Sequence, residues 1–181
     1  MAHSPPRHAV LTGAPGAGKT TLLEAAAATG FQTSPEVARE LLQAPGGMEL
    51  RAGDPLGFAE AMIEAHRREW ERHAAVETPV LFDRGFPDVV GFLDVSGLPV
   101  SPAIDRACRE LRYSGPAFRA PAWADIYAQD AERIQDWDQA VASDEAVTAA
   151  WRRYGYAVIE LPFVSVGERL NFLCTHVNDW S

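Results

Sequence analysis

Short runs that suit the strands of a buried sheet alternate along the chain with longer stretches of helical periodicity. The strand-like runs occur at residues 9–12, 31–33, 80–82, 117–120 and 156–161. A first helix is predicted to follow residue 18 and to end near residue 30, with Leu22, Leu23 and Ala26 on one face. This alternation predicts a parallel sheet that is covered by helices on both faces.

Later helices are predicted from their start signals and their periodicity. Capping residues and proline mark helix starts at residues 34–36 and 54–55. The predicted helices cover residues 36–42, 54–77, 87–95, 101–112, 141–154 and 166–176. Residues 43–54 hold several glycines and prolines and little periodicity, so they are predicted to form a loop. Residues 121–139 are predicted to be a charged connection that becomes helical.

The segment between the first strand and the first helix has a phosphate-binding pattern: two glycines separated by four residues, then lysine and a hydroxyl. It comprises Gly13, Ala14, Pro15, Gly16, Ala17, Gly18, Lys19, Thr20 and Thr21. Glycine lets the backbone approach an anion so that successive N–H groups converge on phosphate oxygens, and the helix dipole points at the same phosphates. Lys19 is expected to reach the outer phosphates and Thr20 to coordinate Mg²⁺. We therefore predict a nucleoside-triphosphate site in a three-layer α/β P-loop domain.

Composition narrows the class of protein. The chain of 181 residues with 47% hydrophobic content suits one domain, residues 1–181. Lys19 is the only lysine among 16 basic residues, and it stands where a phosphate binder is needed. A net charge of −9 without a basic run argues against nucleic acid as a partner. We found neither a signal peptide nor a transmembrane segment, which predicts a soluble, cytoplasmic protein.

Two carboxylates fall at strand ends. Asp83 follows an apolar strand, where it can hold the water shell of Mg²⁺ or accept a proton from an attacking hydroxyl. Glu36 follows the second strand. It is either a second carboxylate that faces the transferred phosphate or an ordinary first-turn glutamate favoured by the helix dipole. The residues alone leave open which of the two carboxylates is the general base.

Two histidines and two cysteines receive structural interpretations. His66 and His73 lie seven residues apart on one predicted helix, about 10 Å along its axis, which is too far for two ligands of one ion. Cys108 and Cys174 are isolated thiols, for which buried packing is the expected role.

Several segments together resemble one family. They are residues 13–21, 35–40, 82–88, 112–113, 121–123, 127 and 130–133. The chain is similar over nearly its whole length to small predicted AAA-type ATPases of the P-loop class. That family includes the ribosylnicotinamide kinase domain of a bacterial NAD regulator and a eukaryotic GTP-binding trafficking protein. Members often carry two prolines where this chain has Ala120 and Pro121.

The resemblance implies a kinase-like parallel sheet with strand order 2-3-1-4-5 and a lid over the nucleotide that carries an arginine. It also implies that Lys19, Thr20 and Thr21 contact phosphate and metal, and that Asp83 is the metal-shell or base carboxylate. Glu36 would then face the acceptor. The lid would span about residues 121–138 and carry Arg133.

The composition of the predicted lid suggests how it is held before nucleotide binds. Carboxylates at residues 130, 132, 136 and 138 surround Arg133 and Arg119, so they are expected to pair with these arginines. Trp123 and Tyr127 either stack on a ring of the ligand or pack the lid, and packing is favoured because of their spacing.

Two functions from different classes fit these features. The leading hypothesis is an enzyme that uses ATP or GTP with Mg²⁺ to phosphorylate a hydroxyl of a small-molecule acceptor. The alternative is a nucleotide-binding switch or sensor with slow hydrolysis that acts through a protein or lipid partner. No segment identifies the acceptor, and no base-reading motif distinguishes ATP from GTP.

Overall fold

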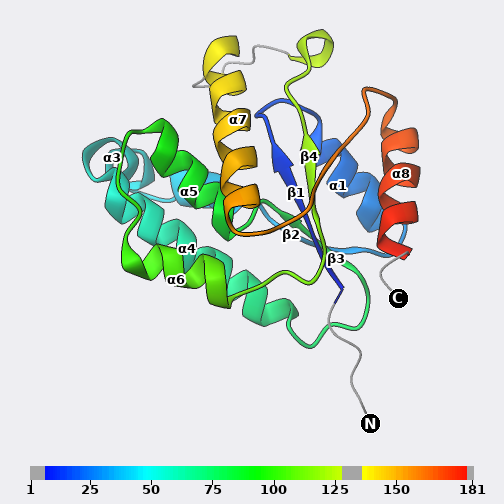
Figure 1. The fold of residues 1–181 in the computed structure, drawn as a ribbon, viewed down its shortest axis with the longest axis horizontal. Coiled ribbons are helices and arrows are strands. Elements are labelled where there is room, and N and C mark those ends of the chain that lie inside the picture. The colour runs from blue at the N-terminus through cyan, green and yellow to red at the C-terminus, as the bar shows by residue number, and fades with distance from the viewer. Residues whose placement is uncertain (1–6, 128–135, 179–181) are drawn as a thin grey trace.

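The sheet is five-stranded and parallel throughout, with the strand order β2-β3-β1-β4-β5. The computed structural model describes residues 7–127 and 136–178 (Figure 1). The strands are β1 (His8–Gly13), β2 (Gln32–Ser34), β3 (Val80–Asp83), β4 (Ala117–Ala120) and β5 (Val158–Glu160). Each predicted strand is present with small shifts at its ends, and the predicted strand order is confirmed.

Helices cover both faces of the sheet, and the alternation of side chains along β1 separates two cores. Ala9 and Leu11 belong to the core under α1 and α8, whereas Val10 belongs to the core under α4, α5, α6 and α7. The bounds are α1 (Lys19–Ala28), α8 (Val166–Asn178), α4 (Pro55–His73), α5 (Phe86–Val95), α6 (Pro102–Glu110) and α7 (Trp137–Arg153). Figure 1 shows these two groups on opposite sides of the sheet. The predicted three-layer α/β architecture is confirmed.

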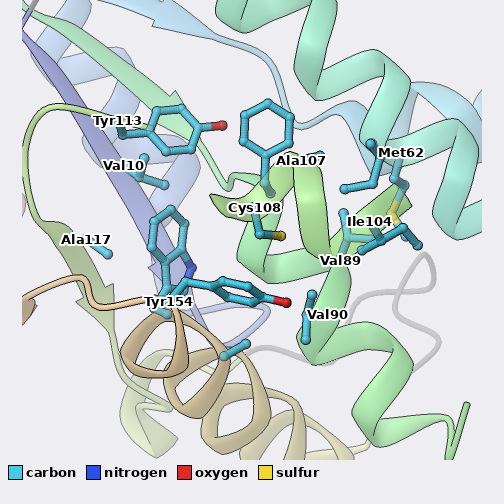
Figure 2. Packing of buried hydrophobic residues seen from close by; sticks show 14 of the residues in the cluster. Val10, Met62, Val89, Val90, Ile104, Ala107, Cys108, Tyr113, Ala117 and Tyr154 are labelled. Carbon is cyan, nitrogen blue, oxygen red and sulfur yellow. The ribbon is translucent and has the colours of Figure 1, made fainter. Parts of the chain in front are cut away.

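The core under α4–α7 is rich in aromatic side chains (Figure 2). Trp151 of α7 is completely buried, with its ring centroid 5.8 Å from that of Tyr113 and 4.7 Å from that of Tyr156. Cys108 lies in the same cluster, where burial raises the pKa of its thiol to about 12. Cys108 is therefore a packing residue, as predicted, and Cys174 is a half-buried free thiol.

The segment between β2 and α4 corrects two predictions. Residues 43–54 are not simply a loop, because they contain the helix α3 (Gly47–Gly53). Glycine is used there for turning and close packing: Gly46 has φ 79°, and a Cβ on Gly47 would lie 1.8 Å from the Leu41 carbonyl oxygen. The preceding helix, α2 (Val37–Gln43), has Glu36 as its N-cap residue without a side-chain capping bond. Capping by a side chain of residues 34–36 was therefore wrong.

Helix α4 starts as predicted and ends earlier than predicted. The Asp54 side chain accepts a hydrogen bond from the Gly57 amide (2.9 Å), and the helix ends at His73 rather than near residue 77. Its histidines, His66 and His73, are both buried. Within the described ranges, none of the helices is both long and apolar enough to traverse a lipid bilayer.

Candidate nucleotide-binding and acceptor site

The phosphate-binding segment lies between β1 and α1, at the centre of the sheet (Figure 1). Gly13 has φ 114°, and a Cβ there would lie 2.2 Å from the Ala120 carbonyl oxygen, so only glycine allows this contact with β4. Gly18 has φ 80° and is the N-cap residue of α1, which leaves the first N–H groups of the helix without a side-chain cap. Donors of this kind at a helix start suit an anion, which is the ligand that the sequence predicts here.

Lys19 is the buried cation of the segment. Its side chain folds back so that Nζ donates a hydrogen bond to the Ala14 carbonyl oxygen (2.5 Å). Burial, followed by the positive charge of Arg84, lowers the pKa of Lys19 to about 8. Because an anion would relieve both effects, Lys19 suits a phosphate ligand. Thr20 and Thr21 are exposed on the same turn and line the adjoining cavity.

Asp83 ends β3 beside β1, in register with Leu11. Its carboxylate is buried, and Oδ1 has no hydrogen-bond partner within the described part of the chain. Burial, followed by the charge of Glu36, raises the pKa of Asp83 to about 6. A buried carboxylate oxygen without a partner is the kind of ligand that hard cations such as Mg²⁺ take.

Glu36 is held by Arg84, which follows Asp83 in the chain. Arg84 Nε donates to Glu36 Oε1 (3.2 Å), and Arg84 Nη1 donates to Asp88 Oδ1 (3.1 Å) and to the Gly13 carbonyl oxygen (3.2 Å). Arg84 lowers the pKa of Glu36, although burial opposes this shift. Glu36 therefore stays ionised at the cavity wall. Arg84 is also the only non-glycine residue with positive φ (65°) among those described, which marks a strained backbone at this strand end.

Asp88, in the first turn of α5, connects this ion network to the core. It accepts hydrogen bonds from the Thr12 hydroxyl, the Gly85 amide (2.9 Å) and the Trp151 indole (2.9 Å). The sequence assigned no role to Arg84 or Asp88. The signal for Asp88 was its place after Pro87 at a helix start, where a carboxylate can cap the helix.

A cavity of about 990 Å³ extends from the phosphate-binding segment to a wall formed by α2, α3, α4 and α5. On the nucleotide side it is lined by Trp123, Ile126, Tyr127, Val164, Ser165 and Arg169. On the other side, which we call the acceptor half, α2, α3, α4 and α5 contribute Val37, Leu42, Met48, Phe58, Met62, His66, Val89 and Phe92, with Arg39 and Arg51. Burial lowers the pKa of His66 to about 4, so this wall carries a neutral imidazole. Lys19, Glu36 and Arg84 line the same cavity.

The predicted lid is only partly described. Arg133 and the carboxylates at residues 130 and 132 lie outside the described residues. Arg119 is paired differently from the prediction, with Asp144 (2.7 Å) and Glu160 (2.9 Å). Trp123 packs against Phe163, and Tyr127 packs edge-on against Trp137, with ring centroids 5.2 and 5.3 Å apart. The packing role favoured for these two aromatic residues matches these contacts.

Comparisons with known proteins agree with the fold of the chain. A family model described as an AAA domain matches residues 8–169. No curated protein matches the chain. Among solved structures, the NadR protein in complex with NR superposes with a TM-score of 0.76 at 18% sequence identity, over 96% of this chain and 51% of that chain.

Two further solved structures are similar over nearly the full length of both chains. Deoxyadenosine kinase from M. mycoides, with the products dCMP and dCDP, has a TM-score of 0.70 at 14% identity, covering 95% of this chain and 99% of that one. Thymidylate kinase from Candida albicans has a TM-score of 0.65 at 7% identity, covering 97% and 92%. At these identities the likeness concerns the fold.

Proposed function

The chain belongs to the AAA domain family, and on that premise we propose that it is an ATP-dependent kinase that transfers the γ-phosphoryl group to a hydroxyl of a small molecule. The observation that supports this proposal is the shared cavity. The phosphate-binding segment, the ionised Glu36 and a largely apolar wall line one space of about 990 Å³. A cavity of this size accommodates a small ligand beside the nucleotide.

On the nucleotide side, the roles follow the chemistry of each group. The free amides after Gly13 and at the start of α1 would bind the phosphates, and Lys19 would leave Ala14 to reach the outer ones. Thr20 and Asp83 would hold Mg²⁺, which when bound neutralises charge on the phosphates. GTP would fit the same groups, because its phosphates are the same as those of ATP and the sequence contains no base-reading motif.

On the acceptor side, Glu36 is the better candidate for the general base. Its low pKa keeps it ionised, and its side chain is partly open to the cavity, with 24% of its surface exposed. Asp83, whose pKa is raised to about 6, would instead serve the metal. Arg84 would hold the Glu36 carboxylate in place, because its Nε donates to Oε1. We infer this division of roles, in which Asp83 binds metal and Glu36 accepts the proton.

The acceptor half suits a flat, mostly apolar group that carries a hydroxyl. Phe58 and Phe92 lie there with their rings edge-on, 5.8 Å between centroids, next to Met62 and the neutral His66. We therefore propose a nucleoside-like acceptor. The solved structures of similar fold include a deoxyadenosine kinase, a thymidylate kinase and NadR with NR, which suggests the same ligand class.

The acceptor half of the cavity favours a kinase over the alternative of a nucleotide-dependent switch, because a switch needs no acceptor pocket.

We also retain two proposals that come from the sequence. They are a cytoplasmic location, and a lid at about residues 121–138 whose Arg133 reaches the transferring phosphate.

The test is a screen of nucleosides, sugars and small alcohols for stimulated release of ADP from ATP and Mg²⁺. A kinase is expected to be slow until its acceptor arrives, and product analysis should find the acceptor phosphorylated. Glu36→Gln should lower the turnover number (kcat) with that acceptor about 100-fold while the Kd for Mg-ATP stays the same. A rate that remains slow with every compound, in protein that binds ATP, would support the switch instead.

A further inference from the structure

Arg169 is a buried cation that the proposed chemistry does not use. It lies in the first turn of α8, and only 2% of its surface is exposed. Burial lowers the pKa of its guanidinium. Within the described residues it forms no ion pair, and its Nη2 is buried without a hydrogen-bond partner. A buried charge without a carboxylate is costly to keep, so its position calls for an explanation.

The contacts of Arg169 join three parts of the nucleotide side. Nη1 donates to the carbonyl oxygen of Ala17 in the phosphate-binding segment (2.8 Å), and Nε donates to the carbonyl oxygen of Pro162 after β5 (2.8 Å). The guanidinium carbon lies 4.8 Å from the ring centroid of Trp123. Helix α8 itself packs beside α1 (Figure 1). Arg169 therefore binds the backbone of the phosphate-binding segment at Ala17, although the two residues are 152 positions apart in the sequence.

The bond to Ala17 fixes the orientation of one peptide group. In a trans peptide, the carbonyl of Ala17 and the N–H of Gly18 point in opposite directions, and no cis peptide bond occurs in the part of the chain that the structure describes. Holding the carbonyl toward Arg169 therefore turns the N–H of Gly18 away from the Arg169 guanidinium. Gly18 has φ 80°, a conformation that glycine exchanges easily with others, so the segment alone does not fix this peptide.

We infer that Arg169 is a positioning residue for the nucleotide, which acts by aiming the Gly18 amide at the phosphate chain. The positive charge of Arg169 adds a second effect. A triphosphate bound next to Gly18 would bring negative charge close to this guanidinium, which forms no ion pair within the described residues, and the attraction would strengthen nucleotide binding. Its contact with Trp123 also links the phosphate-binding segment to the wall on the nucleotide side. This role rests on the nucleotide site of the proposed function, but it does not depend on the acceptor.

The experiment compares Arg169→Met with Arg112→Met. Arg112 is a control for the type of contact, because its Nη1 donates to the carbonyl of Tyr154 (2.6 Å) and its guanidinium lies 3.8 Å from the ring centroid of Tyr156, away from the cavity lining, although Arg112 is exposed. The Kd values of Mg-ATP and of Mg-tripolyphosphate are measured by calorimetry at a temperature where circular dichroism shows each variant folded. Arg169→Met should raise both Kd values by about tenfold or more, and Arg112→Met should raise neither.

A spectroscopic signature separates positioning from a merely structural role. In the wild type, the Gly18 amide proton should shift downfield when Mg-ATP binds, as a hydrogen bond to phosphate requires, and Arg169→Met should lose that shift. Arg169→Lys has one ammonium in place of the several N–H donors of the guanidinium, so it should recover only part of the affinity for Mg-ATP.

A variant with a lower melting temperature but unchanged Kd values and an unchanged Gly18 shift would overturn the inference. Weaker ATP binding with unchanged tripolyphosphate binding would also overturn it, because it would assign Arg169 to the Trp123 wall alone. Wild-type protein that binds no nucleotide would overturn the proposed function itself.

Discussion

The two halves of the cavity are built differently. The nucleotide half has a phosphate-binding part made from one continuous segment, residues 13–21, at the turn from the central strand into α1, and side chains of residues 123–127 and 164–169 line the space beside it. The acceptor half is made from side chains of α2, α3, α4 and α5. Backbone amides offer the same donors whatever the neighbouring side chains are, whereas a wall of side chains changes with each substitution. This construction suits a constant phosphate chain on one side and a variable acceptor on the other.

Asp88→Ala is the change expected to have the largest effect, because the Asp88 carboxylate connects the ion network of Arg84 to the buried core at Trp151. Its carboxylate accepts hydrogen bonds from Arg84, Gly85 and Trp151, and removing it leaves the partly buried Arg84 with one fewer partner. The free energy of unfolding should fall by about 3–5 kcal/mol. Urea unfolding followed by tryptophan fluorescence measures it. Asp94→Ala, on the same helix, removes a surface ion pair with Arg153 and should cost less than about 1 kcal/mol.

Lys19→Ala should have the next largest effect, confined to the nucleotide half. The single lysine of the chain is the group placed to neutralise the outer phosphates, so the Kd for Mg-ATP should rise roughly 100-fold or more. Since burial penalises its charge in the ligand-free protein, the melting temperature should not fall in parallel. Calorimetry and thermal unfolding of the same samples test this. Unchanged ATP affinity would contradict the nucleotide site.

The same contrast explains what the sequence could predict. All strands, and the phosphate-binding segment, follow local rules: short apolar runs, glycine spacing and a helix start after Gly18. The acceptor half does not follow local rules, because its residues come from separate helices and meet only in the folded chain. Helix α3 was missed because Gly46 and Gly47 were interpreted as loop residues, although they serve a left-handed turn and a close contact with Leu41. Arg84 and Arg169 were missed because their partners are far away in sequence.

Asp83→Asn should stabilise the ligand-free protein while weakening Mg-ATP binding. The pKa of Asp83 is raised from 3.8 to about 6, so stability from its protonated form is full below about pH 4 and is lost as the pH rises through 6. The amide never ionises. The variant should therefore gain roughly 1–3 kcal/mol over wild type at pH 7 and almost nothing at pH 4. Urea unfolding at both pH values measures the difference.

Glu36→Gln is the matched control, with the opposite sign. Arg84 lowers the pKa of Glu36 against the effect of burial, so ionised Glu36 contributes stability above its ordinary pKa that is lost as the pH falls. Removing this charge should destabilise the protein at pH 7. Equal and same-signed shifts for both variants would contradict the distinct environments of the two carboxylates.

Phe92→Ala should give the smallest effect, and it tests whether the halves are separate. Phe92 is half-buried in the acceptor wall, edge-on to Phe58, so its truncation removes one aromatic contact from the acceptor. The KM for the acceptor should rise about tenfold with the Kd for Mg-ATP unchanged. Phe163→Ala, which exposes the opposite wall at Trp123, should leave the acceptor KM unchanged. If Phe92→Ala weakens ATP binding as much as acceptor binding, the wall supports the whole cavity, and the acceptor half is not an independent pocket.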